Sequence, residues 1–174
     1  MKKVISLLII IIILVSVNFG QDTANLLVRL LRFEKSLGSR TSGMIDIVIV
    51  YNNNYKESAN EAVRIASQFG KMSDKTVNRK AFKFFVKLYT PNIKNELDNA
   101  EVVYICDMVK PDIIIETAKK NKILTIASNE EFIEEVAVVI KEDEHKNKLH
   151  IKKKLLKDEG VNLSEQILKI SHLY

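Results

Sequence analysis

Residues 45–70, IDIVIVYNNNYKESANEAVRIASQFG, contain the pattern from which the fold class is inferred. Ile45 to Tyr51 is a nearly continuous run of β-branched residues, typical of a strand that is buried on both faces. Three asparagines follow as a turn. Apolar residues then recur at helical spacing from Tyr55 to Phe69, and Gly70 is a helix stop. This stretch predicts a central strand, a loop and a helix.

The same alternation of strands and helices continues on both sides of this unit. Before it, apolar leucines recur at helical spacing after Asp22 or Thr23, either of which can cap a first helix. After it, strands are predicted over 81–89, 100–106, 123–127, 136–140 and 148–152, with a helical turn over 93–97 and a helix over 112–121. Such alternation predicts an α/β fold with a mostly parallel sheet of about five or six strands and helices on both faces.

Three details of the C-terminal third are predicted from local signals. The charged stretch 142–147 separates the last two strands, which is typical of an antiparallel hairpin at one edge of a sheet. Ser128 with Glu131 forms a capping box for a short helix through residue 135. Asn162 with Glu165 caps a last helix that runs to residue 170.

The first twenty residues have the pattern of a secretory signal peptide. A short basic start is followed by an apolar run from Val4 to Val17, and Gly20 is the small residue at the expected cleavage site. The run gives about 21 Å of helix, short of the roughly 30 Å needed to span a bilayer. We therefore expect export to the periplasm and a single domain over 21–174, and a retained anchor is the alternative.

The remaining composition excludes several function classes. The 174-residue chain is 47% hydrophobic and carries a formal net charge of +5, two units of which come from Lys2 and Lys3, so the excess is weak for a nucleic-acid binder. Gly38 and Gly43 have P-loop spacing but lack the lysine and hydroxyl residue that must follow. We expect no catalytic residues, no cofactor and no metal. His145 and His150 are spaced too loosely for a defined metal site.

Two further expectations concern residues at strand ends. Cys106, the single cysteine, is expected to be a small buried side chain without nucleophilic reactivity. In parallel sheets, ligands collect outside the carboxyl ends of the strands. This predicts a ligand-binding or partner-binding site built from Asn52, Asn53, Asn54, Asp107, Ser128 and Asn129.

The order of several short motifs resembles the YfiR/HmsC-like family. The motifs are EVVYIC at 101–106, ILTIAS at 123–128, Phe132 before the strand 136–140, LHI at 149–151 and GVNLSEQILKI at 160–170. With the apolar leader, the first helix and the IDIVIVY strand, the resemblance covers nearly the whole mature chain.

The resemblance implies an exported, non-enzymatic regulator. Members of that family bind the periplasmic part of an inner-membrane diguanylate cyclase and restrain cyclic-di-GMP production until an outer-membrane lipoprotein sequesters them. With Cys106 alone, no intramolecular disulfide can form. The alternative function is a small-solute-binding module that presents a ligand to a membrane receptor or transporter. Whether the chain forms a homodimer is left open.

Overall fold

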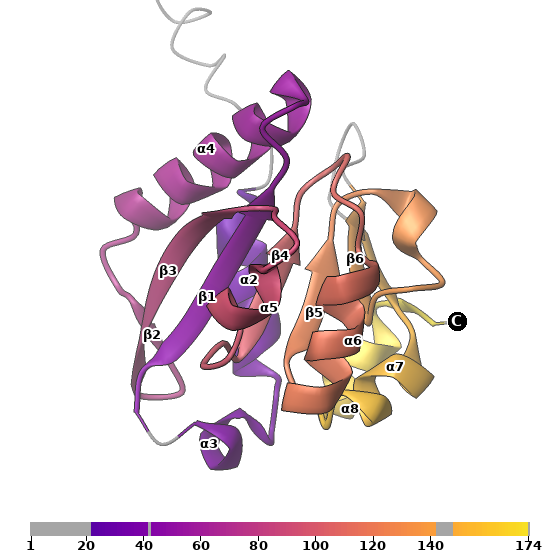
Figure 1. The fold of residues 1–174 in the computed structure, drawn as a ribbon. Helices are drawn as coiled ribbons and strands as arrows, with labels where there is room; N and C mark the ends of the chain where they lie inside the picture. The colour runs from indigo at the N-terminus through magenta and orange to yellow at the C-terminus, as the bar shows by residue number, and fades with distance from the viewer. Residues whose placement is uncertain (1–21, 42, 142–147, 174) are drawn as a thin grey trace, which may run out of the picture.

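The computed structural model describes residues 22–41, 43–141 and 148–173 (Figure 1). The predicted signal peptide and the charged turn at 142–147 lie outside these residues. Across the described part of the chain, no helix combines the length and the apolar character needed to cross a membrane.

An eight-stranded sheet forms the centre of the structure, in the order β2-β3-β1-β4-β5-β6-β7-β8. Strand β1 pairs in parallel with β3 on one side and with β4 on the other, and the parallel pairing continues through β5 to β6. The strands are β1 (Ile45–Tyr51), β2 (Thr76–Val77), β3 (Lys80–Leu88), β4 (Val102–Ile105), β5 (Leu124–Ala127), β6 (Val138–Lys141), β7 (Lys148–Ile151) and β8 (His172–Leu173). The predicted α/β class and mostly parallel sheet are confirmed.

The sheet has two more strands than the sequence predicts. All six predicted strands are present, and the β6–β7 pair is antiparallel as expected. The additional strands, β2 and β8, are two residues long each, which is too short to produce a recognisable alternation of apolar and polar residues. Because β8 pairs with β7, it forms the outer edge beyond the hairpin.

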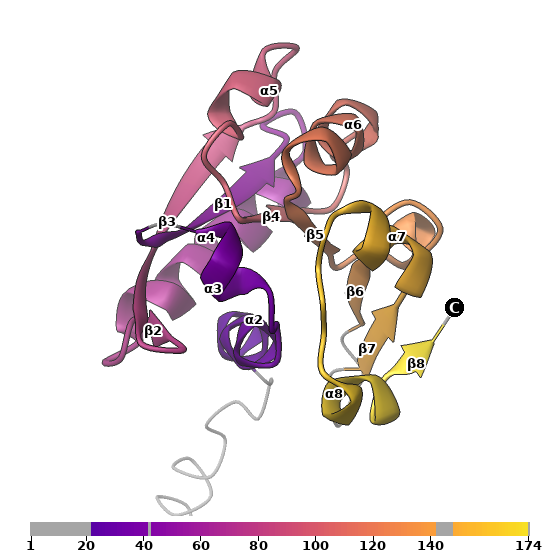
Figure 2. The ribbon, with the colours of Figure 1, turned by 90° about the horizontal axis from the view of Figure 1, so that it is seen from below.

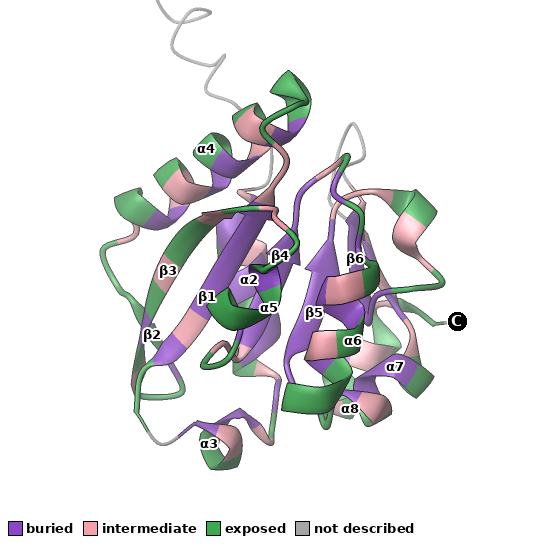
Figure 3. Cartoon of the chain, viewed as in Figure 1, coloured by how far each residue is buried: buried purple, intermediate pink, exposed green. Residues whose placement is uncertain are grey.

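Helices cover both faces of the sheet. Figure 2 shows α5 and α6 on one face and α2 on the other, where α2 packs against α4. The helices are α2 (Thr23–Arg32), α3 (Leu37–Arg40), α4 (Lys56–Lys71), α5 (Ile93–Glu96), α6 (Asp112–Asn121), α7 (Lys153–Asp158) and α8 (Glu165–Lys169), with a 3₁₀ helix η1 (Glu130–Phe132). Enclosed in this way, the central strands are almost wholly buried (Figure 3).

One predicted helix cap is confirmed and two are wrong. Asp22 caps α2, and its Oδ1 accepts hydrogen bonds from the backbone N–H groups of Ala24 and Asn25. At η1 the capping side chain is that of Asn129, not Ser128, because the helix begins at Glu130, directly after Asn129, whose Oδ1 accepts from the backbone N–H of Glu131 at 2.8 Å. The 3₁₀ helix ends at Phe132, short of the predicted residue 135.

The third cap prediction fails because Asn162 has a different role. Helix α8 begins after Ser164, which makes no side-chain capping bond. The backbone carbonyl of Asn162 accepts from Lys35 N at 2.8 Å, and Ser164 N donates to the Phe33 carbonyl at 2.9 Å. These bonds flank an antiparallel bridge between Glu34 and Leu163. The segment before α8 is therefore joined to the end of α2.

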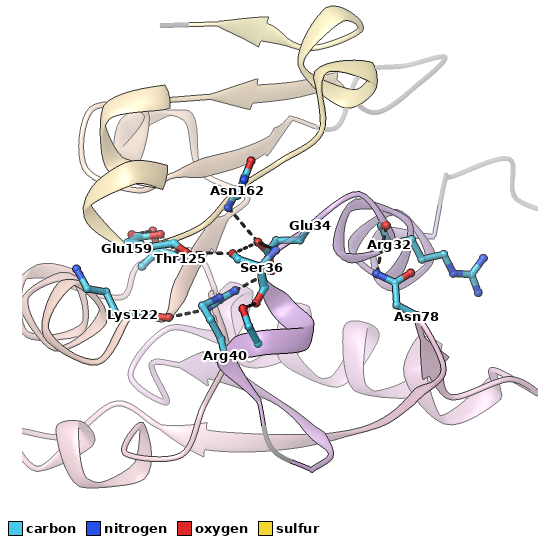
Figure 4. A network of polar contacts seen from close by, with 11 residues as sticks. Arg32, Glu34, Ser36, Arg40, Asn78, Lys122, Thr125, Glu159 and Asn162 are labelled. Carbon is cyan, nitrogen blue, oxygen red and sulfur yellow. Dashed lines mark hydrogen bonds and ion pairs between the residues drawn. The ribbon is translucent and has the colours of Figure 1, made fainter.

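A buried carboxylate strengthens this junction (Figure 4). The Glu34 side chain is fully buried, and its Oε1 accepts from the backbone N–H groups of Ser36 and Asn162, both at 2.9 Å. Arg40 lies 3.2 Å from the other carboxylate oxygen. Removing one member of a buried ion pair is strongly destabilising, so we regard this network as structural.

A second buried carboxylate joins α7 to the sheet (Figure 4). Glu159 follows α7 and accepts two hydrogen bonds from Thr125 on β5, from the backbone N–H at 3.0 Å and from the hydroxyl at 2.5 Å. The same hydroxyl accepts from Ala137 N. Burial raises the pKa of Glu159 to about 7, although the hydrogen bonds from Thr125 oppose the increase.

This pKa predicts a pH dependence of stability. The unfolded chain loses the Glu159 proton near the ordinary pKa of 4.5, whereas the folded chain keeps it up to about 7. The free energy of unfolding should therefore fall as pH rises between these values, by at most about 3 kcal/mol, and level off above them. Urea unfolding of the wild type and of Glu159→Gln across this range measures the effect. The variant should lack the decrease, and an equal decrease in both proteins would contradict the assignment.

Candidate functional site

The predicted site residues lie at the carboxyl ends of neighbouring strands. Asn52 follows β1, Asp107 closely follows β4, and Ser128 with Asn129 follows β5. The Asn52 amide donates to the carbonyl of Met108 at 3.0 Å, and the Asn129 amide donates to Asp107 Oδ1 at 2.7 Å. The ends of β1, β4 and β5 are thus connected by side-chain hydrogen bonds.

Three of the six predicted residues line a common cavity, and the other three do not. Asp107, Ser128 and Asn129 line one cavity. Asn52 is joined to this group through Met108, whose backbone has a φ of 58°, in the left-handed region. Asn53 and Asn54 are exposed in the turn before α4, and the backbone N–H of Asn54 donates to Asn52 Oδ1.

The strand order explains why a cavity forms at this edge. From β1 the chain passes through α4 to β3 on one side and later through α5 to β4 on the other. The connections that leave β1 and β4 therefore diverge over opposite faces of the sheet. In open α/β sheets this reversal opens a crevice outside the carboxyl ends of the strands.

The cavity has a volume of about 470 Å³ and walls rich in charged side chains. Helix α4 contributes Glu57, Glu61 and Arg64, and Lys141 of β6 forms an ion pair with Glu130 at 2.5 Å. Sequence reasoning missed the residues from α4 and β6. The spacing of 57, 61 and 64 was an available signal, because i, i+4, i+7 positions share one helix face.

Glu61 fixes the floor of the cavity. Its Oε1 accepts from the Tyr104 hydroxyl and its Oε2 from the backbone N–H of Asp107, both at 2.8 Å. Burial, followed by the neighbouring Glu61 carboxylate, raises the pKa of Tyr104 well above its usual value. Tyr104 is therefore a neutral hydrogen-bond donor, which holds α4 against β4.

Cys106 lies beneath this floor and is fully buried, as the sequence predicts. Burial, with a further contribution from the Glu61 carboxylate, raises the pKa of the thiol far above its usual range. The thiolate is therefore strongly disfavoured, which does not suit a nucleophile.

Metal ligands are not gathered in the described residues. Over 22–41, 43–141 and 148–173, no group of three His, Cys, Asp or Glu side chains is placed to hold a metal ion. His145 lies outside the described residues. His150 stacks on His172 with ring centroids 5.1 Å apart, and the pKa of His150 is lowered by burial and then by His172.

A larger hollow of about 800 Å³ lies at the opposite ends of the strands. Two of its charged side chains form an ion pair, Lys83 with Asp46 at 3.4 Å, and the Glu101 carboxylate accepts from the backbone N–H of Asp46 at 2.7 Å. Because ligands of parallel sheets collect at carboxyl ends, we assign the candidate site to the smaller cavity.

Substitution of Glu61 tests its part in the cavity floor. Glu61→Ala removes the acceptor of the Tyr104 hydroxyl and of the Asp107 N–H, so it should lower the free energy of unfolding by about 2 kcal/mol. Glu57→Ala is the matched control, since Glu57 lines the same cavity but is exposed, and should change stability by less than about 0.5 kcal/mol. Urea unfolding gives both values, and equal effects would argue against this role.

A family model described as YfiR/HmsC-like matches residues 22–172, which include every helix and nearly every strand residue described above. No curated protein matches the sequence.

Three solved structures share the fold at low identity. An ABC domain in complex with L-Trp from Streptococcus pneumonia is 12% identical, with a TM-score of 0.59 over 84% of this chain and 58% of that one. CD0873, a substrate binding protein with adhesive properties from Clostridium difficile, is 15% identical, with a TM-score of 0.58 over 80% and 57%. A conserved domain protein from Vibrio cholerae is 12% identical, with a TM-score of 0.59 over 86% and 59%. This chain thus spans under three fifths of each of these structures.

Proposed function

Since the chain belongs to the YfiR/HmsC-like family, we propose that it is an exported regulator that binds the periplasmic part of an inner-membrane protein carrying a diguanylate cyclase domain. Binding restrains cyclic-di-GMP production, and an outer-membrane lipoprotein releases the restraint by sequestering the regulator. The observation that carries this proposal is the family match over residues 22–172.

The mechanism is a shift of population between two states of the partner. A regulator that binds the inactive state more tightly than the active state increases the inactive fraction, and its effect is set by the ratio of the two affinities. A hundredfold preference corresponds to about 2.7 kcal/mol. A lipoprotein that competes for the regulator reverses the shift without any covalent change.

The strand ends beside the cavity form the surface that we assign to partner binding, and we call this surface the rim. It combines polar groups at Asn53, Asn54 and Asp107 with the exposed apolar side chain of Met108. The rim is held in place by the bonds from Asn52 to Met108 and from Asn129 to Asp107. A rigid rim with an apolar centre and polar surroundings resembles the usual layout of protein interfaces.

Capture from envelope extracts tests the proposal. The tagged protein should recover a membrane protein with a diguanylate cyclase domain, identified by mass spectrometry. Met108→Asn keeps a residue type that tolerates the left-handed conformation but removes the apolar contact, so recovery should fall about tenfold. Met44→Asn, an equally exposed methionine at the opposite ends of the strands, is the control and should leave recovery unchanged.

Two results would contradict the proposal. Recovery of no such membrane protein, repeated with mild crosslinking, argues against the function itself. Recovery that is unchanged in Met108→Asn and reduced in Met44→Asn argues against the assigned surface.

A small-solute-binding module is the second candidate function. The cavity of about 470 Å³ presents both cationic and anionic side chains, among them Arg64, Lys141 and Asp107, which suit a solute with both charges. The fold is shared with a protein named as a substrate binding protein.

Thermal unfolding in the presence of amino acids and other small zwitterions tests the second function. A solute that binds the cavity should raise Tm in the wild type, because it binds only the folded chain, and should raise it less in Arg64→Gln. Glu116→Gln, on the exposed part of α6, is the control. If no solute raises Tm, or if the increase is equal in all three proteins, the cavity is not a solute site.

A further inference from the structure

Strand β3 has a long open edge. On one side it pairs with β1 from Phe82 to Leu88. On the other side, within the described residues, β2 pairs only with Lys80 and Ala81. Phe82 N donates to the Lys75 carbonyl at 2.9 Å, and no described strand lies beyond this point. Figure 1 shows β3 running along this margin of the sheet.

The alternation of the backbone determines which groups face this edge. Phe82 directs its N–H away from β1, toward Lys75, whereas Tyr89 N donates to the Tyr51 carbonyl on the β1 side at 2.8 Å. Neighbouring residues of a strand direct their backbone groups to opposite sides. The N–H and C=O groups of Phe84, Val86 and Leu88 therefore point outward from the edge, where another strand can bond to them.

Exposed apolar side chains gather at the same place. Phe85, Val86 and Leu88 of β3 are 36%, 41% and 43% exposed. Val63, on the helix α4 that packs against β3, is 69% exposed. Proteins usually protect an open edge with short strands or free charges. Strand β3, in contrast, is nine residues long. Its side chains Lys83 and Lys87 form ion pairs with Asp46 and Glu96 of the same chain.

We propose that two copies of this protein join through their β3 edges, antiparallel, around a two-fold axis at Val86. In this register Val86 faces Val86 of the second copy, and Phe84 faces its Leu88. Residues that lie directly opposite in an antiparallel pair exchange both backbone bonds when their groups point toward each other. The three outward-facing residues of each copy are therefore all bonded, and the two sheets become continuous.

The charges on β3 select this register over its neighbours. With the axis at Val86, Lys87 lies opposite Phe85 of the second copy, and no lysine faces a lysine. An axis at Phe85 would place Lys83 opposite Lys87, and an axis at Lys87 would place that residue opposite itself. Like charges directly opposite are destabilising. An axis at Phe84 would place Val86 opposite Phe82 of the second copy, but the N–H of Phe82 already donates to the Lys75 carbonyl.

The second copy is favoured over a strand of another protein because the edge is self-complementary. The apolar residues with outward backbone groups pair with one another, and the lysine of each copy meets an aromatic ring of the other. Lys83 and Lys87 already lie 5.2 and 5.9 Å from the ring of Phe85 within one copy, which shows that ammonium groups and this ring can approach. This inference uses only the sheet edge and is independent of the proposed function.

Sedimentation equilibrium of the mature protein tests the dimer. The wild type should show a concentration-dependent dimer. Val86→Lys places two ammonium groups together at the axis and should weaken dimerisation at least about tenfold. Ile170→Lys introduces the same charge at a more exposed apolar residue, which follows α8 and lies away from β3, and should change the dissociation constant much less. A wild type that stays monomeric at about 100 µM, where a dimer of even modest affinity would form, overturns the proposal.

A crosslinking experiment keeps the proposal testable if Val86→Lys does not fold. Val86→Cys places two thiols opposite each other at a Cα separation of about 5.5 Å, which allows a disulfide between the copies. Mild oxidation should therefore give a covalent dimer that is reversed by reductant. Leu88→Cys, which faces Phe84 in this register, should crosslink far more slowly. Equal rates for the two variants, or no crosslink in Val86→Cys, would overturn the register.

Discussion

Burial of β1 on both faces and both edges is the constraint on which the rest of the structure depends. Parallel strands β3 and β4 flank it, and its side chains from Ile47 to Val50 are almost inaccessible to water. Parallel neighbours cannot be reached by tight turns, so the chain must cross over a face of the sheet to each of them. The crossover that leaves β1 leads to β3, and the crossover that leaves β3 leads to β4 on the other side of β1. The connections at the carboxyl ends of β1 and β4 therefore diverge, and the cavity at these ends follows from the topology.

Inward-facing carboxylates stabilise the junctions that this topology creates. Glu61 joins α4 to β4, Glu159 joins the end of α7 to β5, and Glu34 joins the end of α2 to the segment before α8. Each accepts a hydrogen bond from a backbone N–H of a distant segment. A carboxylate in this role compensates for a backbone donor that no strand pairs, at a place where an apolar side chain would leave the donor unsatisfied.

The fold was largely predictable from the sequence, because β1, β4 and β6 are compact runs rich in β-branched residues and each long helix has an apolar stripe. Strands β2 and β8 were missed since two residues carry no periodicity. The sequence predicts Ser128 as the cap of η1 instead of Asn129, because both residue types cap helices and only the first residue of the helix, Glu130, distinguishes them. For the site, the strand ends were predictable from topology, whereas the contribution of Lys141 depends on a contact between distant segments that no local pattern reveals.

The bridge between Glu34 and Leu163 also governs the order in which the chain can fold. Glu34 accepts from the backbone N–H of Asn162, which lies 128 positions further along the sequence. The first helix can form early. The contact between Glu34 at its C-terminal end and Asn162 cannot form until almost the entire chain has been synthesised. Contacts between segments so far apart slow folding, because the intervening loop must close first. Acquisition of the native state is thus delayed to the last stage of chain release.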